Sequence, residues 1–157
     1  MSPRDFLQDI VRPNVIDFHA NFGSLRHAHN AVSAVDALAA HLYVWATANN
    51  PAAVAHSNDD SHYRNSLAAR DQSFALLRDI AKAQKHVHLT KHNPQIRRAD
   101  QITSRPIGWG EGGYGEGRFG GVEQVVVDTG PGAFSYVEEV IDSSLAFLEA
   151  EMASIGA

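Results

Sequence analysis

The sequence contains no cysteine, and this absence removes several kinds of chemistry at once. Without thiols there is no disulfide framework, no thiolate nucleophile and no cysteine-ligated zinc site. No window approaches the roughly 18 apolar residues that are needed to cross a bilayer, so we expect no transmembrane helix. The chain begins with MSPRDFLQDIV, which has acidic residues and no apolar core segment, so we expect no signal peptide. These absences lead us to expect a cytoplasmic protein.

Basic residues are also in the minority, with 13 Lys and Arg against 18 Asp and Glu. They are unevenly spread, because residues 82–105 contain six basic residues and one acid, Asp100. Residues 106–157 contain nine acids and one base, Arg118. This asymmetry indicates an anion-binding patch on an otherwise acidic protein. The alternative is that the basic segment packs against the acidic one.

Apolar residues recur at helical spacing over most of the chain. The first predicted helix is short, because Arg12-Pro13 ends it. The second runs from Val15 to about Ala48, and Gly23-Ser24 kinks or divides it. Two more helices are predicted over about 61–89 and about 134–154. Between the last two, two runs rich in β-branched residues flank a glycine-rich tip, which predicts a β-hairpin over about 101–128. We therefore expect an all-α fold class, a single-domain bundle of about four helices over residues 1–157 with this hairpin inserted.

The tip of the predicted hairpin holds eight glycines within residues 108–121 and matches G-x-G-x-x-G more than once. A dinucleotide site needs a helix directly after this motif, whereas a second strand is predicted here. Trp109, Tyr114 and Phe119 on such a loop can stack on bases or pack against a partner protein. One interpretation of the function is therefore a non-enzymatic protein-interaction module that uses this tip.

Nine histidines are many for a chain of this length. Helical phase places His29 and Asp36 on or beside the apolar seam of one helix, and His88 near the seam of the next. These three side chains are candidate ligands for zinc or iron inside a bundle. The alternative is that they form ordinary hydrogen-bonded pairs. The acids over residues 138–151 are predicted to form a solvated helix face, and our leading interpretation uses no metal and no cofactor.

The segment from residue 78 to residue 86 concentrates charge on one helix. Arg78, Lys82 and Lys85 share a face, and Asp79 and His86 lie on an adjoining stripe. A guanidinium and an imidazole are the minimum for cleaving RNA without a metal, because the imidazole moves a proton and the guanidinium stabilises the added charge. A two-fold dimer would supply two such sets. The alternative is an exposed helix face with surface ion pairs.

The predicted bundle, with an Arg…His pair late in one helix, resembles the HEPN superfamily, many of whose members are dimeric ribonucleases of toxin–antitoxin and defence systems. The motif of that family is an Arg, a polar neighbour, and a His after four to six residues; Arg78 and Asp79 match, while seven residues separate Arg78 from His86. The resemblance implies a homodimer that binds or cleaves RNA, with Arg78 as phosphate clamp, Asp79 as orienting group and His86 as acid and base. The remaining expected nucleic-acid contacts are Lys82, Lys85, Lys91, Arg97 and Arg98. The string RDIAKAQKHVHL also resembles a segment of small bacterial proteins and implies no activity.

Overall fold

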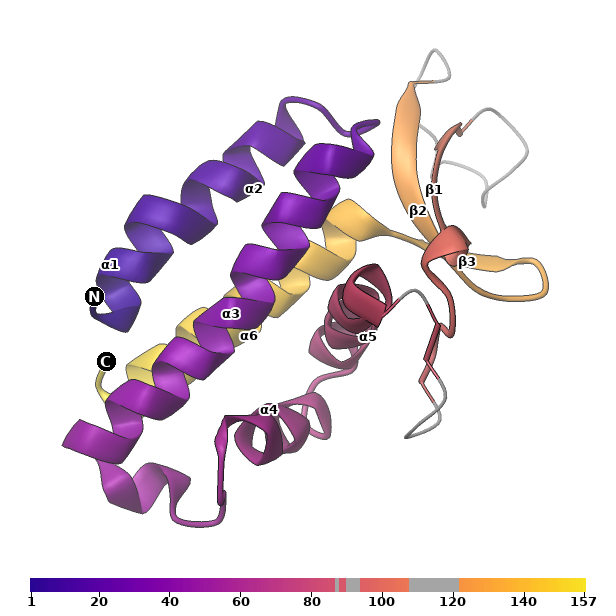
Figure 1. Cartoon of the computed structure of the whole chain (residues 1–157). Coiled ribbons are helices and arrows are strands. Elements are labelled where there is room, and N and C mark those ends of the chain that lie inside the picture. Colours follow the sequence, from indigo (N-terminus) through magenta and orange to yellow (C-terminus); the bar gives the residue numbers. More distant parts are fainter. Residues whose placement is uncertain (87, 90–93, 108–121) are drawn as a thin grey trace.

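Figure 1 shows the computed structural model of the chain, which describes residues 1–86, 88–89, 94–107 and 122–157. The helices are α1 (Pro3–Phe6), α2 (Arg12–His19), α3 (Leu25–Asn49), α4 (Asp60–Ala68), α5 (Gln72–His86) and α6 (Val137–Ile155). Shorter helical turns are η1 (Leu7–Val11), η2 (Pro51–Val54) and η3 (Ala99–Gln101), and the strands are β1 (Ile102–Pro106), β2 (Glu123–Gly130) and β3 (Ala133–Tyr136). Within the described ranges the strands form one antiparallel sheet in the order β1-β2-β3.

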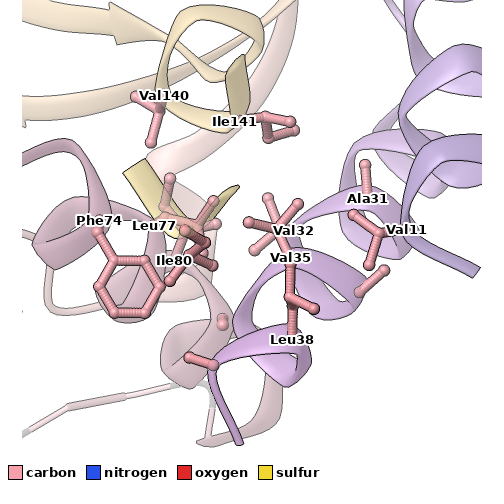
Figure 2. Close-up of a cluster of buried hydrophobic side chains, with 14 of the residues drawn as sticks. Val11, Ala31, Val32, Val35, Leu38, Phe74, Leu77, Ile80, Val140 and Ile141 are labelled. Carbon is pink, nitrogen blue, oxygen red and sulfur yellow. The ribbon is translucent and has the colours of Figure 1, made fainter. Parts of the chain in front are cut away.

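The helices pack around α3, which contacts α2, α4, α5 and α6, and the sheet lies at one end of this bundle (Figure 1). The two termini of the chain lie close together at the opposite end of the bundle, where the Arg4 guanidinium donates a hydrogen bond to the Ala157 carbonyl over 3.2 Å. Figure 2 shows part of the core, whose labelled members include Val32, Val35 and Leu38 of α3, Phe74, Leu77 and Ile80 of α5, and Val140 and Ile141 of α6. Full burial of each such side chain stabilises the fold by about 1.5–3 kcal/mol.

Pro13 does not end the first helix, contrary to the prediction. A proline inside a helix lacks the N–H that would bond to the carbonyl four residues earlier, and its ring crowds that carbonyl. The chain accommodates Pro13 with the π-helical turn η1, where the Arg12 N–H donates to the Leu7 carbonyl. The helix then continues as α2 to His19.

Two of the longer predicted helices are each divided by a capping side chain. The Ser24 hydroxyl accepts a hydrogen bond from the His27 N–H over 3.4 Å and starts α3. The Asp71 carboxylate accepts one from the Phe74 N–H over 2.7 Å, where α5 begins after α4 has ended. Such caps satisfy backbone donors that have no partner within the helix.

The expected all-α fold class is wrong, because the fold is mixed α/β, although mostly helical. The predicted hairpin is present, since β1 pairs with β2 from Ile102 opposite Val127 onward. Residues 133–136, however, form β3 on the other side of β2 instead of starting the last helix. Gly132, with φ at 72°, lies in the left-handed region that glycine favours, and it turns the chain back against β2.

The sheet is attached to the bundle through β2. Val125 and Val127 belong to the helical core, and the Val125 N–H donates to the Phe22 carbonyl in the turn between α2 and α3 over 2.9 Å. A Cβ atom on Gly23 of that turn would lie 2.7 Å from the Cβ atom of Glu123. Only glycine therefore allows this close approach of the turn to β2.

Helix α3 has an 18-residue window with a mean hydropathy of 1.2, which by length and composition is apolar enough to cross a membrane. The expectation that no segment approaches this property is therefore wrong. Half of that window is buried inside the fold, as in a core helix, so composition alone is weak evidence for a membrane span.

Candidate nucleic-acid interface

Arg78, the predicted phosphate clamp, is buried in the middle of α5. Only 5% of the residue is exposed. Its Nη1 donates a hydrogen bond to the Asn65 side chain over 2.7 Å, and its Nε lies 3.7 Å from an Asp36 carboxylate oxygen. Burial lowers the pKa of Arg78, while the charge of Asp36 opposes that shift. Arg78 is thus held by protein groups and directed away from solvent.

Arg78 belongs to a polar cluster, which we define as Asp36, Asp60, Arg64, Asn65 and Arg78; Asp36 and Arg78 are its buried members. The Arg64 guanidinium pairs with Asp36 over 2.9 Å and with Asp60 over 2.7 Å. Among the described residues, three buried atoms of the cluster make no hydrogen bond, namely Asp36 Oδ1, Arg64 Nε and Arg78 Nε. Removing one member of a buried ion pair typically costs about 3–5 kcal/mol, because the other charge stays buried without compensation.

Asp79 and Lys82 also have structural partners. The Asp79 carboxylate accepts a hydrogen bond from the Gln95 N–H over 2.8 Å, and its other oxygen lies 3.8 Å from the Lys82 ammonium. Burial, followed by the nearby Arg78 charge, lowers the pKa of Lys82. Asp79 therefore attaches the segment after α5 to the helix, and within the described part of the chain it makes no hydrogen bond to His86, as an orienting group would require.

His86, the predicted acid and base, is the exposed last residue of α5. It lies eight positions after Arg78, which corresponds to about 12 Å along a helix axis. Within one chain, the buried guanidinium and the exposed imidazole are therefore not placed at a shared site. A combined site formed by two chains stays a prediction.

The predicted phosphate-binding cations that follow Lys82 in the described part of the chain lie on the surface near the end of α5. Ile96 is fully buried in the core, so the chain returns to the bundle and exposes Arg97 and Arg98 beside it. Arg98 pairs with His88 in an antiparallel bridge, and the Leu89 N–H donates to the Arg97 carbonyl over 2.6 Å. We call the resulting group the α5-end basic surface; its members are the exposed residues Lys85, His86, His88, Arg97 and Arg98.

The α5-end basic surface is fixed to the sheet by Gln101. Its side-chain oxygen accepts hydrogen bonds from the Arg97 and Arg98 N–H groups over 2.7 and 3.0 Å. Its side-chain nitrogen donates to the Asp128 carbonyl of β2 over 2.8 Å. The Arg98 guanidinium meets Asp100 over 2.9 Å, but both side chains are largely exposed, and such pairs contribute only about 0–1 kcal/mol. A phosphate group can therefore displace Asp100 at little cost.

Two other parts of the predicted interface fall outside the described residues. Lys91, an expected phosphate contact, is one. The glycine-rich tip, residues 108–121 with Trp109, Tyr114 and Phe119, is the other.

The predicted metal ligands are not brought together. His29 and His88 are exposed on separate elements, whereas Asp36 is buried in its ion pairs with Arg64 and Arg78. Over the described part of the chain, the group whose ligand atoms do converge is His19, Glu138 and Asp142. Sequence reasoning missed this group, although the i, i+4 spacing of the two acids on one helix was a signal for it.

The prediction that the acids of α6 form a solvated face is wrong for Glu151. Glu151 is only 8% exposed. Its carboxylate accepts a hydrogen bond from the Tyr63 hydroxyl over 3.1 Å and pairs with the Arg70 guanidinium over 2.7 Å. The Arg70 guanidinium also lies over the Phe147 ring, 5.5 Å from its centre. This second polar cluster joins α4 to the C-terminal half of α6.

Comparisons of the chain with protein-family models, with curated proteins and with solved structures found no match. The resemblance to the HEPN superfamily therefore stays a prediction from the sequence.

Proposed function

We propose that this protein binds single-stranded RNA, without cleaving it, at the α5-end basic surface. The observation that supports this proposal is the return of the chain at Ile96, which puts Arg97 and Arg98 beside His88 and the end of α5. Arginine and lysine attract the phosphate backbone, and their binding is salt-dependent. The rings of His86 and His88 offer faces on which unpaired bases stack. The choice of RNA follows the resemblance to the HEPN superfamily.

The geometry favours binding over cleavage. Cleavage by the expected mechanism needs a guanidinium at the reacting phosphate, and the Arg78 guanidinium is committed to Asn65 and Asp36 inside the bundle. His86 alone moves a proton but does not stabilise the charge that develops on the phosphate. We therefore assign His86 a contact with the nucleic acid and Arg78 a role in folding.

The test is the binding of a fluorescently labelled single-stranded RNA, measured by anisotropy at low salt. The site variant is Lys85→Ser/Arg97→Ser/Arg98→Ser. Its matched control is Arg4→Ser/Arg12→Ser/Arg26→Ser, which removes the same charge from exposed arginines on other elements. We expect the site variant to lose at least about tenfold in affinity, while the control stays within about twofold of the original protein.

Two results would contradict the proposal. Equal losses in the site variant and in its control would show that net charge, and not this surface, governs binding. No binding by the unaltered protein at low salt would remove the function altogether. The same samples are then analysed on a denaturing gel, where intact RNA is expected and shortened RNA would reinstate cleavage. The homodimer and the cytoplasmic location inferred from the sequence stay predictions.

A further inference from the structure

Three metal-ligating side chains from opposite ends of the sequence meet where α2 ends and α6 begins. His19 is the last residue of α2, and Glu138 and Asp142 lie one turn apart near the start of α6. One ligand atom from each lies within 4.8 Å of the other two. The His19 Nε2 atom and an Asp142 carboxylate oxygen are 3.0 Å apart. The two helices contact each other at the end of the bundle that faces the sheet (Figure 1).

We propose that His19, Glu138 and Asp142 bind a divalent transition-metal ion, for which zinc is the first probe. The donor set is one imidazole nitrogen and two carboxylate oxygens. An imidazole ligand favours zinc and its neighbours over magnesium and calcium, which prefer oxygen ligands alone. Three protein ligands leave a coordination position for water, as in open zinc sites.

The geometry needs only a small side-chain adjustment to accept the ion. Bonds of about 2.1 Å place tetrahedral ligands roughly 3.4 Å apart, and the ligand atoms here all lie within 4.8 Å of one another. The side chains of His19 and Asp142 are 38% and 49% exposed, so both are able to rotate toward a shared ion. The 3.0 Å contact between them already holds two of the three ligands at the required spacing.

This inference is independent of the proposed RNA binding, because the α5-end basic surface contributes no ligand to it. It also replaces the metal site predicted from His29, Asp36 and His88. A metal ion here would join the first 19 residues of the chain to its last helix. Because the unfolded chain does not hold these three residues together, binding of the ion stabilises the folded state.

The experiment uses the untagged full chain, freed of metal with a chelator and dialysed against zinc. Elemental analysis then gives the zinc content per chain, and cobalt absorption spectra report the ligand environment. The ligand variants are His19→Ala, Glu138→Gln and Asp142→Asn, and the controls are His29→Ala and Glu139→Gln, which alter exposed residues of the same types outside the ligand set. Circular dichroism checks that each variant is folded.

We expect one zinc ion per chain and a raised melting temperature when zinc is present. Loss of one ligand should weaken binding by more than the roughly 10- to 100-fold that loss of an outer-shell partner costs, whereas the controls should bind as the original protein does. The proposal is overturned if folded protein retains no zinc, or if the ligand variants bind zinc as tightly as the controls do. In either case His19 and Asp142 form only a surface ion pair.

Discussion

Helix α5 carries the same kinds of basic side chain in two regions that behave differently. In its middle, Arg78 is buried and hydrogen-bonded to Asn65, whereas Lys85 near its end is exposed. The difference comes from the covering elements, because α3 and α4 supply Asp36 and Asn65 over the middle of the helix. A row of cations on one helix face is therefore not one site. The neighbours in space decide which members stabilise the fold and which remain available to a ligand.

The largest expected effect is on stability, from Arg78→Met. This change leaves the buried Asp36 carboxylate with Arg64 as its remaining ion-pair partner. We expect the free energy of unfolding to fall by about 3 kcal/mol, the low end of the range for a broken buried pair, because Arg64 still compensates Asp36; urea denaturation measures this loss. Lys85→Met, seven residues along the same face, is the matched control and should change stability by no more than about 0.5 kcal/mol. If the two variants are equally stable, the contrast between the two regions does not hold.

A second variant, Tyr63→Phe, tests the buried polar cluster around Glu151. Tyr63 is 1% exposed, and its hydroxyl donates to the Glu151 carboxylate. Hydrogen bonds to charged groups contribute about 1.5–3 kcal/mol, so we expect a loss of this size near neutral pH. The loss of stability in Tyr63→Phe, set beside that in Arg78→Met, then shows which of the two polar clusters that involve α4 contributes more to the stability of the fold.

The same variant has a signature in its pH dependence. Burial, with the Glu151 charge as a further cause, raises the pKa of Tyr63 above its usual value near 10. A raised pKa in the folded state gives stability that is fully present below about pH 10 and is lost as the pH rises above that value. We therefore expect the original protein to lose more stability than Tyr63→Phe between about pH 9 and about pH 11. If the two proteins lose the same amount of stability across this pH range, the burial argument is contradicted.

The smallest expected effect is on binding, from single changes in the α5-end basic surface. Lys85→Ser removes one exposed cation and should lower RNA affinity about two- to fivefold without measurable loss of stability. Arg26→Ser, an exposed cation at the start of α3, is the matched control. A larger loss for the control than for Lys85→Ser in anisotropy measurements would place the interface elsewhere.

The burial of Arg78, in contrast to the exposed end of α5, was partly predictable from the sequence. Arg78 lies four residues after Phe74 and three before Ala81, and both of these belong to the buried face of α5. That spacing was a local signal that Arg78 also faces the bundle. Its partners Asp36 and Asn65 were not predictable, because they come from other helices and no local pattern pairs them with Arg78.

The parts of the fold that the sequence predicted are local, and those it missed depend on distant contacts. The hairpin of β1 and β2 was predicted from β-branched runs around a turn. The strand β3 was missed because its four residues continue directly into α6 and become a strand only by pairing with β2. The contact between His19 and Asp142 was not predictable for the same reason, because it forms only when α2 packs on α6.

The salt dependence of RNA binding tests the central claim most directly. Each phosphate contact to a single strand contributes about 0.7 to the slope of log affinity against log salt concentration. If the exposed cations bind and the buried one does not, Lys85→Ser/Arg97→Ser/Arg98→Ser should reduce this slope by about 2, and folded Arg78→Met should keep the original slope. A reduced slope in Arg78→Met, with an unchanged slope in the triple variant, would contradict the division of α5 into a structural and a binding region.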